Sequence, residues 1–383
     1  MNYIPRIIEK ELKKRLFKGK IVIIYGARQV GKTTIAKRIL AEYGNAAAFF
    51  NCELISVVRG LSDLEAVKIK AFLGEHKLVV LDEAQNVPNI GKVLKIMVDT
   101  YPEMQIIATG SASFDLMQKI SEPMTGRNFS FILQPLSMKE IKEAQGMATM
   151  EAKLESILRF GSYPEVFNLD EKAAIERLGE ISSNYLFKDV LNFDGLKKAE
   201  VIKNLLRLLA LQIGQEVSYH ELATQLGIDR LTVQKYIDVL EQCFIVFRLR
   251  ALSQNKRKEI SKSIKVYFYD LGIRNSLIEN YNRLELRSDV GFLWENFCII
   301  ERNKLNEAAY RNANRYFWRT YEQKEIDLVE ERDGKFFAYE FKWKKDNKKA
   351  PQEFLKNYAN SQYQIINREN YWDFLVSDDA PNL

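Results

Sequence analysis

Residues 21–34 read IVIIYGARQVGKTT, and this stretch decides the fold expected for the first part of the chain. Ile21–Tyr25 is a short apolar, β-branched run without alternation, which predicts a strand buried on both faces. The next eight residues, GARQVGKT, fit the spacing G-x-x-x-x-G-K-[ST] at every fixed position, and a helical pattern follows from Thr34. A strand, a glycine loop and a helix in this order predict a loop that binds phosphate groups.

The residue types of this loop match the chemistry of a nucleotide. Gly26 and Gly31 let the backbone curl, so that successive N–H groups point inward at the positive end of a helix. Lys32 would reach the β- and γ-phosphates, and the hydroxyl of Thr33 would bind Mg²⁺. The residues expected to contact ATP are Gly26, Ala27, Arg28, Gln29, Val30, Gly31, Lys32, Thr33 and Thr34.

A second motif lies at residues 78–83, LVVLDE, where an apolar strand ends in two carboxylates. After a phosphate loop, such a strand end predicts the Walker B arrangement. Asp82 would hold the Mg²⁺ shell, and Glu83 would orient or deprotonate the attacking water.

Three further residues are candidates for the γ-phosphate. Residues 105–109 predict another strand, at whose end Thr109 or Ser111 would hydrogen-bond the γ-phosphate or the attacking water; alternatively, Ser111 caps a helix. Arg127 is a candidate arginine finger, acting in cis or toward a neighbouring subunit, or else a surface group. Farther on, Ser137 and Glu140 have the spacing of a capping box.

The stretches GARQVGKTT, LDEAQ, ATGSAS, TGR and LQPLSMKE, in that order, resemble the AAA+-type P-loop ATPases of bacteria and archaea that carry a C-terminal domain of unknown function. The resemblance covers the whole chain. It implies a parallel five-stranded ATPase sheet that binds Mg-ATP. Because AAA+ relatives often form rings, it also implies a homo-oligomer in which Arg127 would act across an interface, although a cis role fits equally.

Length and composition set broader limits. A chain of 383 residues predicts two or three domains, and a net charge of +6 permits a nucleic-acid partner without requiring one. Two histidines, and three cysteines without C-x-x-C spacing, argue against histidine-based metal chemistry, a zinc site and a disulfide framework. Residues 1–18 read as a charged amphipathic helix with Lys and Arg on its wet face. No run is long enough for a membrane span, so we expect a cytoplasmic protein.

The expected fold class is α/β, in four parts. Residues 1–140 form the ATPase domain, 141–200 a helical lid or connector, 201–285 a winged helix, and 286–383 an α/β restriction-endonuclease-like domain. In the winged helix, residues 230–242 would enter a DNA major groove through Arg230, Thr232, Gln234 and Lys235, with Lys256, Arg257 and Lys258 on phosphates. The alternative is a module that only packs or contacts protein.

The C-terminal part holds a second constellation. Asp327, Glu340 and Lys342 have the spacing D-x₁₂-E-x-K, which resembles the core of the PD-(D/E)xK nuclease fold. The resemblance implies a second divalent metal held by Asp327 and Glu340, with Glu295 completing the shell and Lys342 stabilising negative charge. The leading proline of that signature is not evident here, and a structural copy of the fold without cleavage is the alternative.

Mg-dependent ATP hydrolysis, coupled to DNA or a protein partner, is therefore the predicted function. Two alternatives remain open from the sequence. One is a metal-dependent DNA nuclease regulated by ATP. The other is a nucleotide-switched DNA-binding protein without turnover, for which a second carboxylate at Glu83 has no chemical use.

Overall fold

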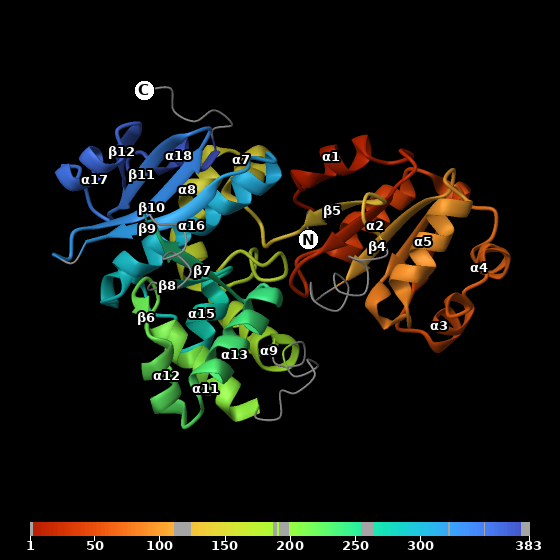
Figure 1. Ribbon diagram of the computed structural model, residues 1–383, viewed down its shortest axis with the longest axis horizontal. Helices are drawn as coiled ribbons and strands as arrows, with labels where there is room; N and C mark the ends of the chain where they lie inside the picture. Colours follow the sequence, from red (N-terminus) through yellow and green to blue (C-terminus); the bar gives the residue numbers. More distant parts are fainter. Residues whose placement is uncertain are drawn as a thin grey trace. The chain divides into compact units, whose positions relative to one another are not determined.

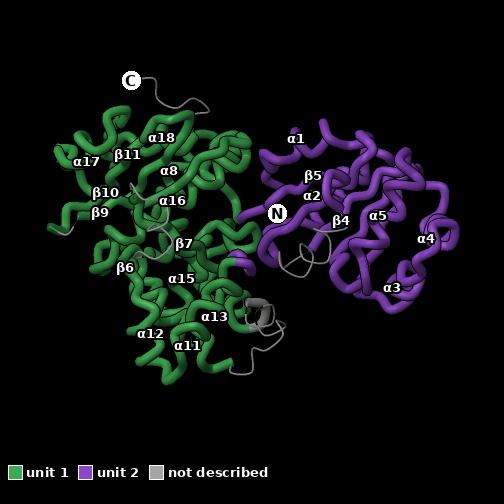
Figure 2. Tube along the Cα trace, viewed as in Figure 1, with its two compact units in different colours: residues 1, 135–241, 245–383 green, residues 2–134, 242–244 purple. Residues whose placement is uncertain are grey.

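The computed structural model describes residues 3–110, 124–186, 190, 199–253, 264–320, 322–347 and 349–376 (Figure 1). The chain divides into two compact units, coloured separately in Figure 2. Unit 2 contains residues 2–134 with 242–244, and unit 1 contains residues 135–241 with 245–383.

Unit 2 is built on a parallel sheet. Its strands are β1 (Ile21–Tyr25), β2 (Ala47–Asn51), β3 (Leu78–Asp82), β4 (Gln105–Gly110) and β5 (Asn128–Ile132). Its helices are α1 (Ile8–Lys14), α2 (Lys32–Ala41), α3 (Ile55–Leu61), α4 (Ala66–Leu73) and α5 (Ile90–Thr100), with short 3₁₀ turns η1 (Gly44–Ala46) and η2 (Ala84–Asn86). Within the described residues, five strands follow the order β2-β3-β4-β1-β5, and every pairing is parallel.

The apolar runs explain this sheet. β1, β3 and β4 are almost wholly buried, because helices cover both faces of a parallel sheet and leave no face for polar residues. α5 turns Ile90, Val93, Leu94 and Met97 toward the core, which is the spacing of one helix face. The predicted five-stranded parallel sheet is confirmed. The loop that follows β1 and the acidic end of β3 therefore lie at the same edge of the sheet.

Unit 1 combines helices with a mixed sheet. Its helices are α7 (Met138–Gln145), α8 (Met147–Phe160), α9 (Glu171–Glu180), α11 (Ala199–Leu211), α12 (Tyr219–Leu226), α13 (Arg230–Gln242), α15 (Leu271–Leu277), α16 (Val290–Ala308), α17 (Gln352–Asn357) and α18 (Tyr371–Val376), with a π-helical turn η3 (Ile181–Leu186) and a 3₁₀ turn η4 (Leu284–Leu286). Its strands are β6 (Glu216–Val217), β7 (Val246–Ala251), β8 (Ile264–Phe268), β9 (Asn314–Arg319), β10 (Glu325–Arg332), β11 (Lys335–Phe341) and β12 (Ser361–Ile366).

The strands of unit 1 join into one sheet. Across the described part of the chain, seven strands follow the order β12-β11-β10-β9-β7-β8-β6. β7 pairs antiparallel with β8 and parallel with β9, so the strands expected in a winged helix continue into those expected in the nuclease-like domain. The domain boundary expected between residues 285 and 286 therefore divides strands that belong to one sheet. β6, β7 and β8 precede this boundary, and β9, β10, β11 and β12 follow it. The three helices expected before the wing are present as α11, α12 and α13.

Residues 141–186 pack within unit 1. The side-chain amide of Asn275, on α15, donates to the carbonyls of Leu158 and Arg159 at 3.0 and 2.9 Å. The Arg159 guanidinium donates to the carbonyl of Tyr281. These contacts explain why this segment groups with unit 1.

The capping box predicted from the sequence is confirmed, and local residues also explain the start of α12 and the turn between β10 and β11. Ser137 and Glu140 form the capping box of α7. Ser218 accepts a hydrogen bond from the backbone of Glu221 at the start of α12. Between β10 and β11, Asp333 and Gly334 have φ values of 49° and 73°, as a tight hairpin turn requires.

Candidate functional site

The phosphate loop of unit 2 has the backbone that its glycines predict. Gly26 has φ of 150° and Gly31 has φ of 101°, and Gln29 between them is left-handed at 62°. A Cβ on Gly26 would lie 2.1 Å from the carbonyl oxygen of Leu133, so only glycine fits there. Gly31 directly precedes α2, and the N–H groups of the helix start face the loop. The loop therefore forms a cradle for an anion.

Lys32 is the first residue of α2 and is buried, with 4% of its surface exposed. Its ammonium donates hydrogen bonds to the carbonyl oxygens of Gly26 at 3.1 Å and Ala27 at 2.7 Å. These bonds hold the side chain back along the loop, inside the cradle. A phosphate in the cradle would meet this ammonium with no rearrangement of the helix.

The residue after Lys32 joins the loop to the acidic strand end. The Thr33 hydroxyl lies 2.9 Å from each carboxylate oxygen of Asp82, which is the last residue of β3. Asp82 also accepts a hydrogen bond of 2.5 Å from the Thr109 hydroxyl on β4. One helix and two strands, α2, β3 and β4, thus meet at one carboxylate. A hydroxyl and a carboxylate are oxygen ligands of the kind that Mg²⁺ prefers, so Thr33 and Asp82 fit the expected metal.

Glu83 follows in a left-handed conformation, with φ of 53°. Its backbone N–H donates to the Thr109 hydroxyl at 3.2 Å, and its carboxylate accepts a hydrogen bond from the side-chain amide of Gln85. Left-handed backbone is uncommon for a residue other than glycine, and it turns the chain sharply at the end of β3. Glu83 is therefore held at the loop edge of the sheet from two sides.

Arg6 belongs to this region and was missed by the sequence analysis, which placed the basic residues of the N-terminal segment on a wet face. Arg6 precedes α1 and is buried, with 6% of its surface exposed. Its guanidinium donates to the carbonyl of Val30 in the phosphate loop at 2.7 Å and to that of Gln134 at 2.5 Å. Gln134 is the last residue of unit 2 before the chain passes to unit 1. The only signal in the sequence is an arginine beside Pro5, which is too common to identify such a contact.

The two other candidates for the γ-phosphate differ in outcome. Ser111 lies outside the described residues. Arg127 directly precedes β5, and its backbone carbonyl accepts from the N–H of Ile21 at the start of β1. It is therefore at the amino ends of the strands, about 16 Å along the sheet from the loop. The Arg127 side chain is exposed and pairs with Asp99 at 2.7 Å. This placement excludes a cis arginine finger within unit 2 and corrects that expectation.

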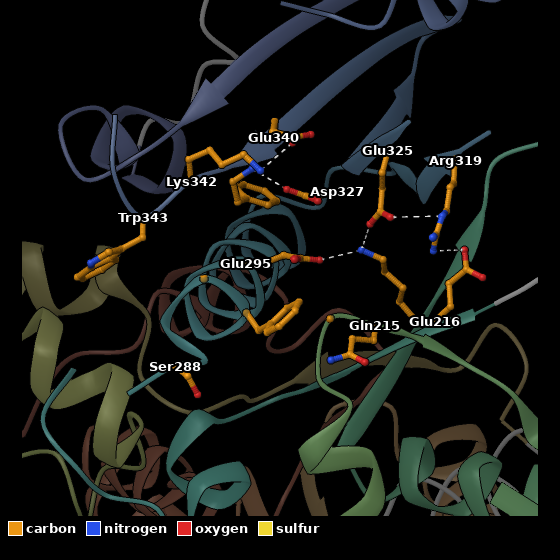
Figure 3. A pocket seen from close by; sticks show the side chains of 15 residues that line it. Gln215, Glu216, Ser288, Glu295, Arg319, Glu325, Asp327, Glu340, Lys342 and Trp343 are labelled. Atoms are coloured by element: carbon orange, nitrogen blue, oxygen red, sulfur yellow. Dashed lines mark hydrogen bonds and ion pairs between the residues drawn. The ribbon is translucent and has the colours of Figure 1, made fainter. Parts of the chain in front are cut away.

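The four residues of the predicted second site meet in a cavity of about 660 Å³ in unit 1 (Figure 3). Glu295 comes from α16, Asp327 from β10 and Glu340 from β11, with Lys342 just beyond that strand. The Lys342 ammonium lies 2.9 Å from Glu340, as expected for residues two apart on an extended strand. The Asp327 carboxylate accepts from the backbone N–H of Phe341 at 2.8 Å.

Two residues of β8 that the sequence analysis missed contact Glu295, and one of them, Lys265, lines the cavity. The Lys265 ammonium lies 3.1 Å from Glu295, and the Tyr267 hydroxyl donates to the same carboxylate at 2.5 Å. Burial raises the pKa of Glu295, although Lys265 and Tyr267 oppose this rise. Burial also raises the pKa of Asp327 well above its usual range, with further repulsion from Glu295 and Glu340.

These residues do not form the expected metal centre. In the parts of the chain that the structure describes, no group of three or more His, Cys, Asp or Glu side chains is arranged to hold a metal ion. Glu295, Asp327 and Glu340 instead each accept hydrogen bonds from protein donors. The cavity gathers the predicted residues, but their donor set does not fit a second divalent metal.

One further observation concerns the helices. None of those within the described ranges is both long enough and apolar enough to cross a membrane.

Three regions of the chain match family models. Residues 18–142 match an AAA domain, and residues 151–284 and 290–374 match two domains of unknown function, DUF8612 and DUF4143. The first region contains Lys32, Thr33, Asp82 and Glu83, so unit 2 carries an AAA-type P-loop domain. The seven-stranded sheet of unit 1 takes strands from both of the other regions.

Similar proteins are known from bacteria and archaea. An uncharacterized protein of Mycobacterium tuberculosis is 28% identical over 338 residues, which cover 86% of this chain and 72% of the relative. An uncharacterized protein of Methanocaldococcus jannaschii is 28% identical over 330 residues, covering 78% and 73%.

Solved structures show only distant likeness. The Pif1 helicase of Candida albicans has a TM-score of 0.27 at 15% identity, covering 48% of each chain. A chain in the structure of Drosophila ORC bound to AT-rich DNA and Cdc6 has a TM-score of 0.25 at 8% identity, covering 71% of this chain and 92% of that one. At these scores the likeness carries no information on function.

Proposed function

We propose that unit 2 binds ATP with Mg²⁺ and hydrolyses it to ADP and phosphate. The observation that carries the proposal is the hydrogen bonding of the Thr33 hydroxyl to the Asp82 carboxylate at 2.9 Å. It brings a phosphate-binding loop and an acidic strand end together at one edge of a parallel sheet, where ligands of such sheets bind.

Each residue has a distinct role in this proposal. Thr33 and Asp82 would hold Mg²⁺, which would supply positive charge against the phosphate groups. Lys32 would exchange its two carbonyl contacts for the β- and γ-phosphates, and the loop N–H groups would hold the remaining oxygens.

Glu83 would act on water. As the water oxygen bonds to the γ-phosphorus, the water proton passes to the Glu83 carboxylate, and the bond from the γ-phosphorus to the bridging oxygen breaks. Thr109 supports this role because it contacts both the backbone of Glu83 and the carboxylate of Asp82.

The experiment is phosphate release from ATP with Mg²⁺ by Glu83→Gln, alongside equilibrium binding of ATP. Turnover should fall on the order of 100-fold or more because the general base is lost, while ATP binding stays close to that of the wild type. Glu103→Gln, an exposed glutamate before β4, is the matched control and should keep full turnover. A Glu83→Gln protein with undiminished turnover would remove Glu83 from its role. A wild type that binds ATP without turnover would favour the nucleotide switch.

We further propose DNA as the partner of unit 1. α13 follows the turn at Gly227 and exposes Arg230, Gln234 and Lys235. Thr232, also expected on this face, instead bonds with Asp229 at the helix start, and Lys256, Arg257 and Lys258 lie outside the described residues. An exposed helix with two cations suits the backbone and base edges of a major groove.

Binding to duplex DNA, measured by fluorescence anisotropy over a series of salt concentrations, tests this partner. The double variant Arg230→Ala/Lys235→Ala should bind more weakly and show a shallower salt dependence, since fewer phosphate contacts release fewer counterions. Lys92→Ala/Lys95→Ala, which removes two exposed cations from α5, should match the wild type. Equal loss in both double variants would show that charge alone, and not α13, governs binding.

A metal-dependent nuclease remains the rival function. It is not proposed, because the carboxylates that would hold its metal accept hydrogen bonds from Lys265, Tyr267, Lys342 and a backbone N–H.

A further inference from the structure

The cavity of unit 1 contains a row of charges that alternate in sign. Figure 3 shows Glu295, Glu325, Arg319 and Glu216 along this row, with dashed lines between successive partners. The Lys265 ammonium pairs with Glu295 at 3.1 Å and also with Glu325. Arg319 then pairs with Glu325 at 3.7 Å and with Glu216 at 2.9 Å. Each cation in the row lies between two carboxylates.

The position of Lys265 on its strand is unusual for a lysine. All five residues of β8 are buried, and Lys265 has 2% of its surface exposed. Lys265 and Tyr267 lie two apart and therefore share a face of β8, from which both reach the same oxygen of Glu295. The Lys265 ammonium also lies 5.6 Å from the ring centre of Phe317. A buried ammonium is costly unless it is paired, so this placement depends on the carboxylates around it.

The carboxylates depend on Lys265 in turn. Glu295, Asp327 and Glu340 have less than a tenth of their surface exposed. Several buried carboxylates within one cavity repel one another and need a cation among them. In a metal centre a divalent ion has that place. Here a divalent ion would meet the Lys265 ammonium, and it would have to displace the hydrogen bonds of Glu295.

We propose that Lys265 is the resident cation of this cavity, in the place that a divalent metal takes in a carboxylate metal centre, and that the cavity binds no divalent metal while Lys265 is present. The row of ion pairs then has a structural consequence. It ties β6 and β8, from the region that matches DUF8612, to α16, β9 and β10, from the region that matches DUF4143. The proposal does not depend on ATP hydrolysis in unit 2.

The test uses the full chain carrying Asp82→Asn, so that the expected Mg²⁺ site of unit 2 contributes no metal binding. Mn²⁺ binding is measured without nucleotide by electron paramagnetic resonance. Thermal unfolding is followed by tryptophan fluorescence, with Mn²⁺ or with EDTA. All four tryptophans lie in unit 1, so this signal reports the unit that holds the cavity.

The Asp82→Asn parent should bind no Mn²⁺ in the cavity and should unfold at the same temperature in Mn²⁺ and in EDTA. Adding Lys265→Met should lower the Tm by roughly 10 °C, because the buried carboxylates lose their counter-ion. Mn²⁺ should then bind at one site and restore part of that loss. Lys265→Arg should retain most of the parent Tm and bind no Mn²⁺.

Lys304→Met is the matched control. Lys304 is also buried in unit 1, where it pairs with Glu301 and donates to the carbonyl of Leu136, away from this cavity. Its loss should lower the Tm without creating a Mn²⁺ site.

Two results would overturn the proposal. One is Mn²⁺ binding by the Asp82→Asn parent that is lost when Glu340→Gln is added. This result would show that the cavity is a native metal centre. The other is a folded Lys265→Met protein that gains no Mn²⁺ site. If Lys265→Met does not fold, Mn²⁺ binding by the folded parent and its Glu340→Gln variant still decides.

Discussion

The two charged clusters of this chain look alike in composition and differ in how their charges are balanced. In unit 2, the carboxylate of Asp82 accepts from two neutral hydroxyls, Thr33 and Thr109, and the Lys32 ammonium donates to the backbone carbonyls of Gly26 and Ala27. In unit 1, several carboxylates surround Lys265 and Lys342 as ion pairs. These contacts of Lys32 and Asp82 in the first cluster are with neutral groups, which a nucleotide and its metal can replace. The second is balanced internally.

This difference shows that residue types alone do not identify a metal site. An Asp, a Glu and a Lys are present in both clusters, and both lie near strand ends. What separates them is whether protein cations already neutralise the carboxylates. Three predictions test this comparison.

The largest expected effect is that of Thr33→Val. Valine keeps the shape of threonine but removes the hydroxyl that would bind Mg²⁺ beside Asp82. ATP turnover should fall on the order of 100-fold, and more Mg²⁺ should be needed for half-maximal rate. Phosphate release over a Mg²⁺ titration measures both quantities. Thr100→Val, which changes an exposed threonine at the end of α5, is the control and should keep full activity. Equal activity in the two variants would break the comparison.

A smaller effect is expected for Arg6→Ala. The change removes the hydrogen bonds from the guanidinium to Val30 and Gln134, so the phosphate loop loses a support on its outer side. ATP affinity should weaken about tenfold, since a charged hydrogen bond contributes on the order of 1.5 kcal/mol or more. Arg6→Lys should recover part of the affinity. Arg15→Ala, which removes a partly buried arginine just after α1, should leave it unchanged.

Equilibrium binding of ATP at fixed Mg²⁺ measures the effect. Comparing the change in KM with the change in kcat shows whether the variant has lost the support of the phosphate loop or a part of its active, folded protein. A change in kcat alone, with ATP affinity preserved, would contradict the proposed support of the loop.

The smallest effect concerns the pH dependence of unit 1. Burial raises the pKa of Asp327 well above its usual range. The charged groups that act on this carboxyl are Glu295, Glu340 and Lys265. Between the ordinary aspartate pKa and this raised value, the folded state binds a proton that the unfolded state has released. The free energy of unfolding should therefore fall as pH rises through that window.

Asp327→Asn should flatten this dependence, and the exposed control Glu353→Gln should not. Urea unfolding followed by tryptophan fluorescence at several pH values measures it in unit 1 alone. A parallel pH dependence in wild type and Asp327→Asn would show that another group is responsible.

The parts of the fold that the sequence predicted are those set by local chemistry. The apolar run of β1 and the Ser137 capping box each depend on a few neighbouring residues, and each is found where expected. The proximity of Glu340 and Lys342 was also predicted correctly, because residues two apart on a strand share one face.

The parts that could not be predicted depend on contacts between distant residues. Lys265 and Glu295 are 30 positions apart, Arg6 and Gln134 are 128 apart, and no local pattern links them. The pairing of β7 with β9 likewise depends on register, which joins two regions that the sequence suggested were separate. The expected cis role of Arg127 at the γ-phosphate was wrong for the same reason. The parallel pairing of β5 with β1 puts Arg127 at the amino ends of the strands, away from the phosphate loop.

The most direct test of the account follows ATP and DNA in the same tubes. Wild type, Lys32→Ala and Glu340→Gln are incubated with ATP, Mg²⁺ and plasmid DNA, and both phosphate release and DNA integrity are measured. The account predicts turnover in wild type and Glu340→Gln, its loss in Lys32→Ala, and intact DNA throughout. DNA cleavage that requires the metal and disappears in Glu340→Gln would contradict it, because the cavity of unit 1 would then be the reactive site.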